Sequence, residues 1–242
     1  FARILGTSRA AAESLHRSPP PETEADGKEL RRQLRPNPQG YLPADQVAML
    51  FDTVGISRTQ EQLIEHAADL HYIAIPFPWA MKVDGPVHKS DVEGVRLNIT
   101  SHEEAHHIAR QLMNIPGAEG MLIQEMAEGM EFYCGASRDP SFGHLLMAGL
   151  GGVFVETLRD TSSRLLPIDR KTARSMLTSL RSYPILAGTR GKAPLDIEGF
   201  IDILLKIQEL IIMLPEISEM DLNPVLVSEN GAVSVDARIR IE

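Results

Sequence analysis

The sequence predicts a mixed α/β fold in which antiparallel strands dominate the second half of the chain. Several stretches place apolar residues at the three- and four-residue spacing of a helix face, and short alternating stretches joined by turn residues follow from residue 120 onward. The two patterns do not alternate regularly, as they would in a wholly parallel sheet. A length of 242 residues suits one large domain or two small ones.

The charge balance argues against general nucleic-acid binding. The chain has 24 Lys and Arg against 33 Asp and Glu, a formal net charge of −9, whereas such binding depends on basic residues that neutralise phosphates. A small anionic ligand in a locally basic pocket is compatible with it. No apolar run approaches the roughly 18 residues of a membrane helix. The single cysteine, Cys134, suits a reducing compartment, and we expect a cytoplasmic protein.

The first 41 residues differ in composition from the rest. Residues 1–17 are rich in Ala and Arg and predict one helix, whereas residues 18–27 contain three consecutive prolines and several acids, which predict an exposed linker. This segment is either a disordered tail or the end of a preceding domain with its tether. Because the chain begins with Phe1 instead of Met, we expect it to be part of a larger protein.

Residues 42–118 combine helical and strand patterns. Val47, Leu50 and Val54 lie on one face of a helix, and Ser101 with Glu104 forms an S-x-x-E capping box at a helix start. The predicted elements are helices over 44–54, 59–70 and 102–113 and strands over 79–83 and 95–99.

Residues 119–242 are richer in strands. Asn230-Gly231 is a strong signal for a two-residue hairpin turn, and Asn223-Pro224 is expected to interrupt a strand. The predicted elements are strands over 120–126, 131–137, 144–147, 217–221, 225–227 and 232–237 and helices over 170–180 and 197–213.

Lys82 is the only charged residue in the apolar stretch 73–83. A buried lysine needs a partner or an anionic ligand because an unpaired buried charge is costly. Taken alone, the pattern favours an ordinary lysine on an edge strand, with phosphate binding as the alternative. The next loop, 85–94, offers His88, Lys89 and Ser90, and it is equally compatible with a flap over phosphates and with a surface hairpin.

A strand that ends in Gln124-Glu125-Met126-Ala127, followed by Glu131, could present backbone groups to a flat base and carboxylates to a ribose. An acidic residue at a strand end is common, so this signal is weak alone.

Asn223 and Asp236 lie on either side of the predicted turn at Asn230-Gly231, so strand pairing would bring them together. One amide oxygen and one carboxylate suit Mg²⁺, which takes few protein ligands. The alternative is a structural Asx turn before a proline.

Other catalytic arrangements find no support. The eight histidines lack metal-ligand spacing, no G-x-S-x-G motif occurs, and Cys134 lies within a predicted strand without an evident base.

Taken in order, these motifs resemble the ATP-grasp domain of NDP-forming acyl-CoA synthetases. The motifs are K-V, H-K-S-D-V-x-G-V, Q-E-M-A, S-R-D-P-S-F-G, G-L-G-G-V-F-V-E, D-L-N-P and V-D-A-R. ADP-forming acetyl-CoA synthetases are the nearest members and succinyl-CoA synthetase is more distant. The resemblance implies two subdomains, 42–118 and 119–242, that clamp a nucleotide, with 1–41 as the tail of a preceding domain and a Pro-rich linker.

The resemblance also implies ligands for ATP or ADP and Mg²⁺. The phosphate-binding residues, of which Lys82 and His88 would be catalytic, are Lys82, His88, Lys89 and Ser90. The residues at the adenine and ribose are Glu125, Met126, Ala127 and Glu131. The metal-binding residues are Asn223, Asp236 and Glu156.

The implied reaction joins an acid to CoA with conversion of ATP to ADP and phosphate, through a phosphohistidine in a partner CoA-binding portion. His88 would act as a relay. We expect the chain to bind nucleotide without completing the thioester reaction, and to belong to an oligomer.

The sequence departs from the family pattern at Glu93, where a glycine is usual, and in a shorter stretch between Lys82 and His88. A regulatory ATP-grasp module of a fused protein acetyltransferase is therefore the alternative function, and an ATP-grasp carboxylate–amine ligase is a weaker one.

Overall fold

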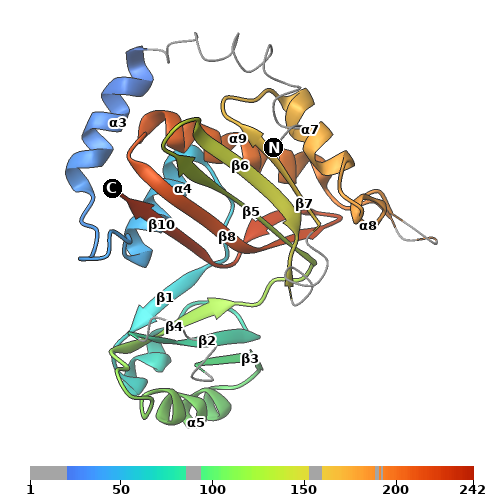
Figure 1. The fold of residues 1–242 in the computed structure, drawn as a ribbon. Helices are drawn as coiled ribbons and strands as arrows, with labels where there is room; N and C mark the ends of the chain where they lie inside the picture. Colours follow the sequence, from blue (N-terminus) through green and yellow to red (C-terminus); the bar gives the residue numbers. More distant parts are fainter. Residues whose placement is uncertain (1–20, 86–93, 153–159, 189–190, 192) are drawn as a thin grey trace. The chain divides into compact units, whose positions relative to one another are not determined.

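The computed structural model describes residues 21–85, 94–152, 160–188, 191 and 193–242 (Figure 1). The chain divides into two compact units. The larger unit comprises the described residues up to Arg58 and those of Glu128–Glu242, and the smaller unit is Thr59–Ala127. The boundaries that we predicted at 41/42 and 118/119 do not coincide with these units, because residues 42–58 belong to the larger one and strand β4 to the smaller one.

Both units combine helices with antiparallel strands, as the sequence predicts. The elements of the larger unit are α3 (Pro21–Gln33), α4 (Ala44–Val54), β5 (Met130–Asp139), β6 (Gly143–Leu150), β7 (Thr161–Leu165), α7 (Arg170–Thr178), α8 (Tyr183–Leu186), α9 (Ile197–Met213), β8 (Ile217–Ser228), β9 (Gly231–Ser234) and β10 (Ala237–Ile241). Those of the smaller unit are β1 (Glu61–Ile64), η1 (Ala67–Tyr72), β2 (Trp79–Asp84), β3 (Val95–Ile99), α5 (His102–Leu112) and β4 (Gly120–Glu125).

The smaller unit is a four-stranded antiparallel sheet in the order β1-β4-β2-β3. Helix α5 packs Ala105, Ile108 and Leu112 into a core that includes Trp79 from β2. The predicted capping box is present: the Ser101 hydroxyl accepts a hydrogen bond from the N–H of Glu104 at 3.2 Å. Its return contact is displaced by one residue, because the Glu104 carboxylate accepts from the N–H of Thr100 at 3.0 Å.

The helix predicted over 59–70 is wrong, because this stretch forms strand β1 and the 3₁₀ helix η1. Glu61–Ile64 pairs antiparallel with β4, with Ile64 opposite Met121. Leu63 is 54% exposed whereas Ile64 is buried. Adjacent apolar residues therefore point to opposite faces of a strand, and pairing with β4 overrides the helical spacing.

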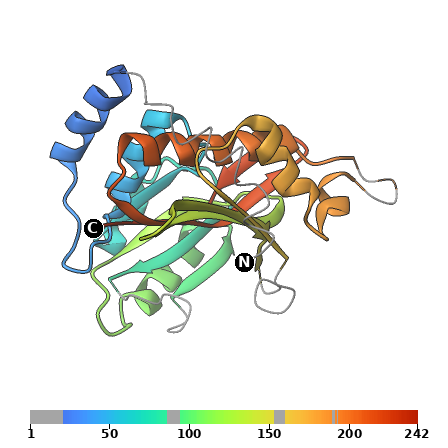
Figure 2. The ribbon, with the colours of Figure 1, turned by 45° about the horizontal axis from the view of Figure 1, so that its top comes forward.

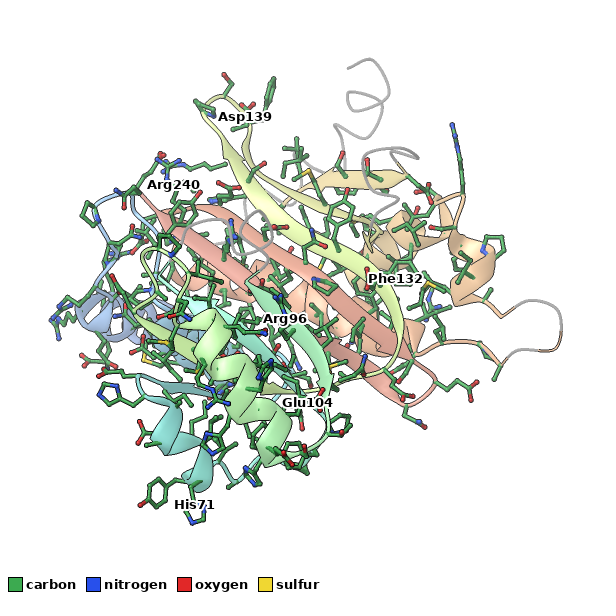
Figure 3. The ribbon with its side chains drawn as sticks, turned by 90° about the horizontal axis from the view of Figure 1, so that it is seen from below. His71, Arg96, Glu104, Phe132, Asp139 and Arg240 are labelled. Atoms are coloured by element: carbon green, nitrogen blue, oxygen red, sulfur yellow. The ribbon has the colours of Figure 1, made fainter. Side chains whose placement is uncertain are left out.

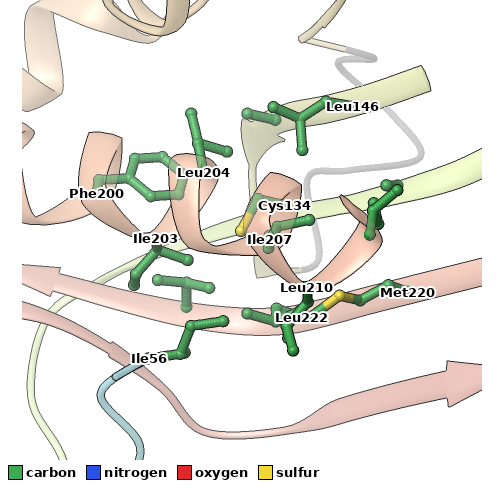
Figure 4. Packing of buried hydrophobic residues seen from close by; sticks show 14 of the residues in the cluster. Ile56, Cys134, Leu146, Phe200, Ile203, Leu204, Ile207, Leu210, Met220 and Leu222 are labelled. Carbon is green, nitrogen blue, oxygen red and sulfur yellow. The ribbon is translucent and has the colours of Figure 1, made fainter. Parts of the chain in front are cut away.

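The larger unit is a six-stranded antiparallel sheet in the order β10-β8-β5-β6-β7, with β9 also paired to β8. Helices α4, α7 and α9 lie on one face of this sheet (Figure 2). Helix α9, which the sequence predicts with the same bounds, buries Phe200, Leu204 and Ile207 against Cys134 and Met220 of the strands (Figure 4). The core therefore lies between the helices and this one face.

The lead-in to the larger unit is more ordered than predicted. Residues 18–27 were expected to form an exposed linker, but helix α3 begins at Pro21, where the missing N–H of proline leaves no helical hydrogen bond unmade. Helix α3 contacts α9, and at the buried Gly27 a Cβ would clash with the carbonyl of Met213. Arg31 forms an ion pair with Glu216, which fastens the helix further. The helix predicted over 1–17 lies outside the described residues.

The two short strands predicted over 217–221 and 225–227 are one continuous strand, β8, which crosses Asn223-Pro224. Pro224 lacks an N–H, but its carbonyl still accepts from Val235 at 3.0 Å. The strand predicted over 232–237 instead ends at Ser234, and the chain then enters β10. Among the described residues, none of the helices has the length and apolar character needed to cross a membrane.

Candidate functional site

Strands β8, β9 and β10 bring Asn223 and Asp236 together. Strands β9 and β10 pair in succession with the same edge of β8, so the short connection between them lies opposite Asn223 and Pro224. The N–H of Asn223 donates a hydrogen bond to the carbonyl of Asp236 at 3.0 Å. Both residues are exposed. The predicted approach of these two residues is confirmed, and it depends on main-chain contacts.

Charged residues surround this pair. Burial raises the pKa of Asp221, and the nearby carboxylates of Glu219 and Asp236 raise it further, while Arg238 opposes the shift. Asp221 and Arg238 are direct partners on β8 and β10. The metal-binding candidates therefore lie in a group of carboxylates with one adjacent guanidinium.

The donor set fits Mg²⁺. Asn223 and Asp236 offer oxygen ligands, and within the part of the chain that the structure describes no group of three or more His, Cys, Asp and Glu side chains could hold a metal ion. Mg²⁺ is commonly held by one or two carboxylates, with water and phosphate oxygens completing the octahedron. A metal that needs a full set of protein ligands, such as structural zinc, does not fit these described residues.

Glu131 lies at the start of β5 and contacts the glycines that follow β6. Its carbonyl accepts a hydrogen bond from the N–H of Gly151 at 2.8 Å. Its carboxylate lies where a Cβ of Gly152 would be, and Gly152 has a φ of +71°. Glycine is therefore required here both by the backbone conformation and by the position of the acid. The Glu131 side chain is exposed, so its carboxylate is accessible.

The face of the same sheet opposite α4, α7 and α9 carries polar residues to which the sequence analysis assigned no role. They include Asp221, Arg238 and Tyr133. The Tyr133 ring lies over Gly149, 2.6 Å from where a Cβ would stand. Burial raises the pKa of Tyr133, and a hydrogen bond with Thr161 lowers it in part. The two-residue alternation of strands places Glu131 and Tyr133 on one face of β5, and this signal could have identified the tyrosine.

In the smaller unit Lys82 lies on β2, between β4 and β3. It stands opposite Leu122 and Val95 and is only 8% exposed. The edge-strand alternative is therefore excluded. Gln124 is buried on the neighbouring strand and donates to Glu61 at 3.1 Å. The position of Lys82 is that of a buried cation on a central strand, where charge must be compensated.

The backbone at Glu125 and Met126 is engaged within the smaller unit. The N–H of Glu125 donates to the carbonyl of Gln60 at 3.0 Å, and the N–H of Met126 donates to Pro78 at 3.2 Å. In return, the N–H of Gln60 donates to the Glu125 carboxylate at 2.9 Å, not to its main-chain carbonyl. The Glu125 side chain thus completes the end of the ladder between β1 and β4. Ala127, the last of this predicted group, is partly buried.

Other predicted site residues lie outside the described residues. They are His88, Lys89 and Ser90, with the variant position Glu93, and Glu156 after the glycine cluster.

Comparison with known proteins identifies relatives for most of the chain. A model of the ATP-grasp domain family matches residues 33–241. The β subunit of acetate–CoA ligase (ADP-forming) II from Pyrococcus furiosus is 45% identical over 199 residues, covering 76% of this chain and 81% of the relative. The corresponding β subunit of ligase I from the same organism is 41% identical over 194 residues, covering 76% and 82%.

A solved structure has the same fold. It is the dinucleotide-forming acetyl-coenzyme A synthetase 1 of Ca. Korarchaeum cryptofilum, in complex with coenzyme A and Mg-AMPPCP. It is 38% identical to this chain with a TM-score of 0.77, and the match covers 89% of this chain and 100% of that one.

Proposed function

This chain belongs to the ATP-grasp family, within the group that contains the β subunits of ADP-forming acetate–CoA ligases, and we propose that it binds ATP or ADP with Mg²⁺ and transfers a phosphoryl group. The overall reaction would join an acid to CoA as ATP becomes ADP and phosphate. The relatives are ligase subunits, which favours this function over a regulatory module of a protein acetyltransferase.

One observation carries the proposal: a main-chain hydrogen bond holds Asn223 and Asp236 next to each other on an exposed edge of the larger unit. Two oxygen donors from the protein would leave most of the coordination shell of Mg²⁺ to water and to phosphate oxygens. The bound ion would neutralise charge on the phosphates. A Mg-nucleotide analogue is present in the related synthetase, which supports the same ligand class here.

The other residues have supporting roles in this proposal. Lys82 supplies a buried positive charge to the phosphates, and His88, Lys89 and Ser90 form a flap over them. Glu125, Met126 and Ala127 border the adenine, and Glu131 accepts from the ribose hydroxyls. Glu156 is a further candidate near the metal. These groups bind and orient the nucleotide, which is most of what phosphoryl transfer requires of a protein.

In the direction of ATP synthesis, a β-phosphate oxygen of ADP attacks the phosphorus of a phosphohistidine. A P–O bond forms as the P–N bond breaks, and the imidazole leaves with the electron pair. We place the first phosphohistidine in a partner CoA-binding portion of the enzyme. As a relay, His88 would take the phosphoryl group from that histidine and would then be the phosphohistidine that ADP attacks. We also propose that the whole enzyme is an oligomer. A cytoplasmic location agrees with a single, buried thiol at Cys134.

A binding experiment tests the proposal. ADP with Mg²⁺ should raise the melting temperature of the chain. The shift should vanish in Lys82→Met, which removes the charge and puts an unbranched apolar side chain at this buried position. Lys171→Ala, at an exposed lysine of α7, removes the same charge and should leave the shift intact. Absence of any shift in the unsubstituted chain would refute nucleotide binding.

A further inference from the structure

Strand β10 places two arginines on the sheet face that lies away from the helices. Ile239 and its partner Met220 are buried in the core under α9. Because side chains alternate along a strand, Arg238 and Arg240 point to the opposite face. Arg238 lies directly across from Asp221, and Arg240 across from Glu219.

The two arginines differ in what they contact. The Arg240 side chain is labelled in Figure 3. Its guanidinium donates to the carbonyl of Gln39 at 3.1 Å and pairs with Glu242 at 3.4 Å. Arg238 is exposed, and no residue in the described part of the chain accepts a hydrogen bond from it or pairs with it within 4 Å. Its charge lowers the pKa of Asp221, its partner across the two strands. The guanidinium of Arg238 is therefore available to a ligand.

The carboxylates around Asn223 and Asp236 give such a cation a role beside the metal ion. Asp221 and Asp236 interact electrostatically, and Glu219 adds a third carboxylate. A phosphoryl group that reaches the metal site would meet these negative charges. A guanidinium binds phosphate through parallel charge-assisted hydrogen bonds, and it remains protonated throughout the physiological range.

We propose that Arg238 is a further catalytic residue, which donates hydrogen bonds to the terminal phosphate of ATP, the group in transfer. This inference rests on the proposed function of the chain. Arg238 forms no covalent bond. It holds the nonbridging oxygens of the terminal phosphate and stabilises their charge while the bond between the terminal phosphorus and the β-phosphate oxygen forms or breaks.

The test compares two nucleotides and two arginines. Calorimetry measures the binding of two nucleotides, each with Mg²⁺: the β,γ-methylene analogue of ATP, and ADP itself. The proteins compared are the unsubstituted chain, Arg238→Met and Arg240→Met. We expect Arg238→Met to weaken binding of the analogue by about tenfold to a hundredfold, as loss of charge-assisted hydrogen bonds predicts, and to leave ADP binding nearly unchanged. Arg240→Met should bind both nucleotides normally.

Other outcomes are equally informative. Unchanged binding of the analogue by Arg238→Met, or equal losses for the analogue and ADP, would overturn the role of Arg238 at the terminal phosphate while leaving nucleotide binding established. If the unsubstituted chain binds neither nucleotide, the proposed function itself fails. Arg238→Lys retains the charge without the planar fork and should bind the analogue with intermediate affinity, which gives a second test if the Met variant folds poorly.

Discussion

The main-chain N–H of Asn223 donates to the carbonyl of Asp236 at 3.0 Å. Since neither side chain takes part, both side chains can be replaced without breaking the contact. Asp236→Asn should therefore fold normally, and its binding of ADP should require a higher concentration of Mg²⁺. Loss of an outer-shell partner alone costs about 10–100-fold in metal affinity, so removal of a direct ligand should cost at least about tenfold. Titration of Mg²⁺ at fixed ADP measures this.

The matched control for Asp236→Asn is Glu229→Gln. Glu229 lies in the exposed turn between β8 and β9, so its substitution removes the same charge close by in the chain. An equal rise in the Mg²⁺ concentration that ADP binding requires in both variants would attribute the effect to net charge and would argue against coordination by Asp236.

Gly152→Ala should weaken nucleotide binding through Glu131. Gly152 has a φ of +71°, and the added Cβ would clash with the Glu131 carboxylate. Gly143→Ala is the matched control, because Gly143 has a φ of +82° with no atom within 4 Å of a Cβ. Both variants should lose roughly 1–2 kcal/mol of stability from the left-handed backbone, measured by denaturant unfolding. Only Gly152→Ala should also reduce ADP affinity. Equal ADP affinity in the two variants would contradict the proposed contact between Glu131 and the ribose.

Elements whose stability is local were predictable from the sequence. Helices α4 and α9 have the predicted bounds because their apolar spacing matches the face that they bury. The 59–70 stretch was not predictable in this way, since pairing of β1 with β4, about 60 residues away in the chain, decides its conformation. The continuity of β8 likewise depends on β5, which pairs with it on both sides of Asn223.

The approach of two candidate site residues was predictable where chemistry and turn signals coincide. The Asn230-Gly231 hairpin implied that Asn223 and Asp236 would meet, and they do. Arg238 was visible in the V-D-A-R motif, but what distinguishes it from Arg240 is a contact between residues distant in sequence, the hydrogen bond from Arg240 to Gln39. The central position of Lys82 similarly required the strand order of the smaller sheet.

Glu125→Ala should alter the preference of the chain for adenine over guanine nucleotides. At present the Gln60 N–H donates to the Glu125 carboxylate at 2.9 Å, so the Glu125 carbonyl does not receive it. Without the carboxylate, this N–H can turn to the carbonyl, which is then less able to accept from the amino group of adenine. We expect weaker ADP binding and a smaller ratio of ADP to GDP affinity. Glu125→Gln keeps an acceptor oxygen and should retain the preference, and a ratio unchanged in both variants would contradict this role.

Asp160 should make folding sensitive to acid. It is 8% exposed and accepts hydrogen bonds from the N–H groups of Arg181 at 2.8 Å and Ser182 at 2.7 Å. Burial raises the pKa of Asp160, but the hydrogen bonds from Ser182 and Arg181 outweigh it and hold the pKa below its ordinary value. A carboxylate with a depressed folded-state pKa stabilises the fold above its unfolded pKa of about 3.9, and this stability is lost as the pH falls through the folded value.

Asp160→Asn should therefore lower the free energy of unfolding at neutral pH by about 1.5–3 kcal/mol, because an amide offers one acceptor oxygen where two N–H groups converge. The difference from the unsubstituted chain should narrow as the pH falls below about 4. Asp169→Asn is the comparison: the side chain of Asp169 caps helix α7 by accepting a hydrogen bond from the N–H of Thr172 at 2.7 Å, and asparagine caps helices equally well. Urea unfolding at neutral and acidic pH measures both variants. A deficit in Asp160→Asn that stays constant down to acidic pH would show that its charge is not what stabilises the turn.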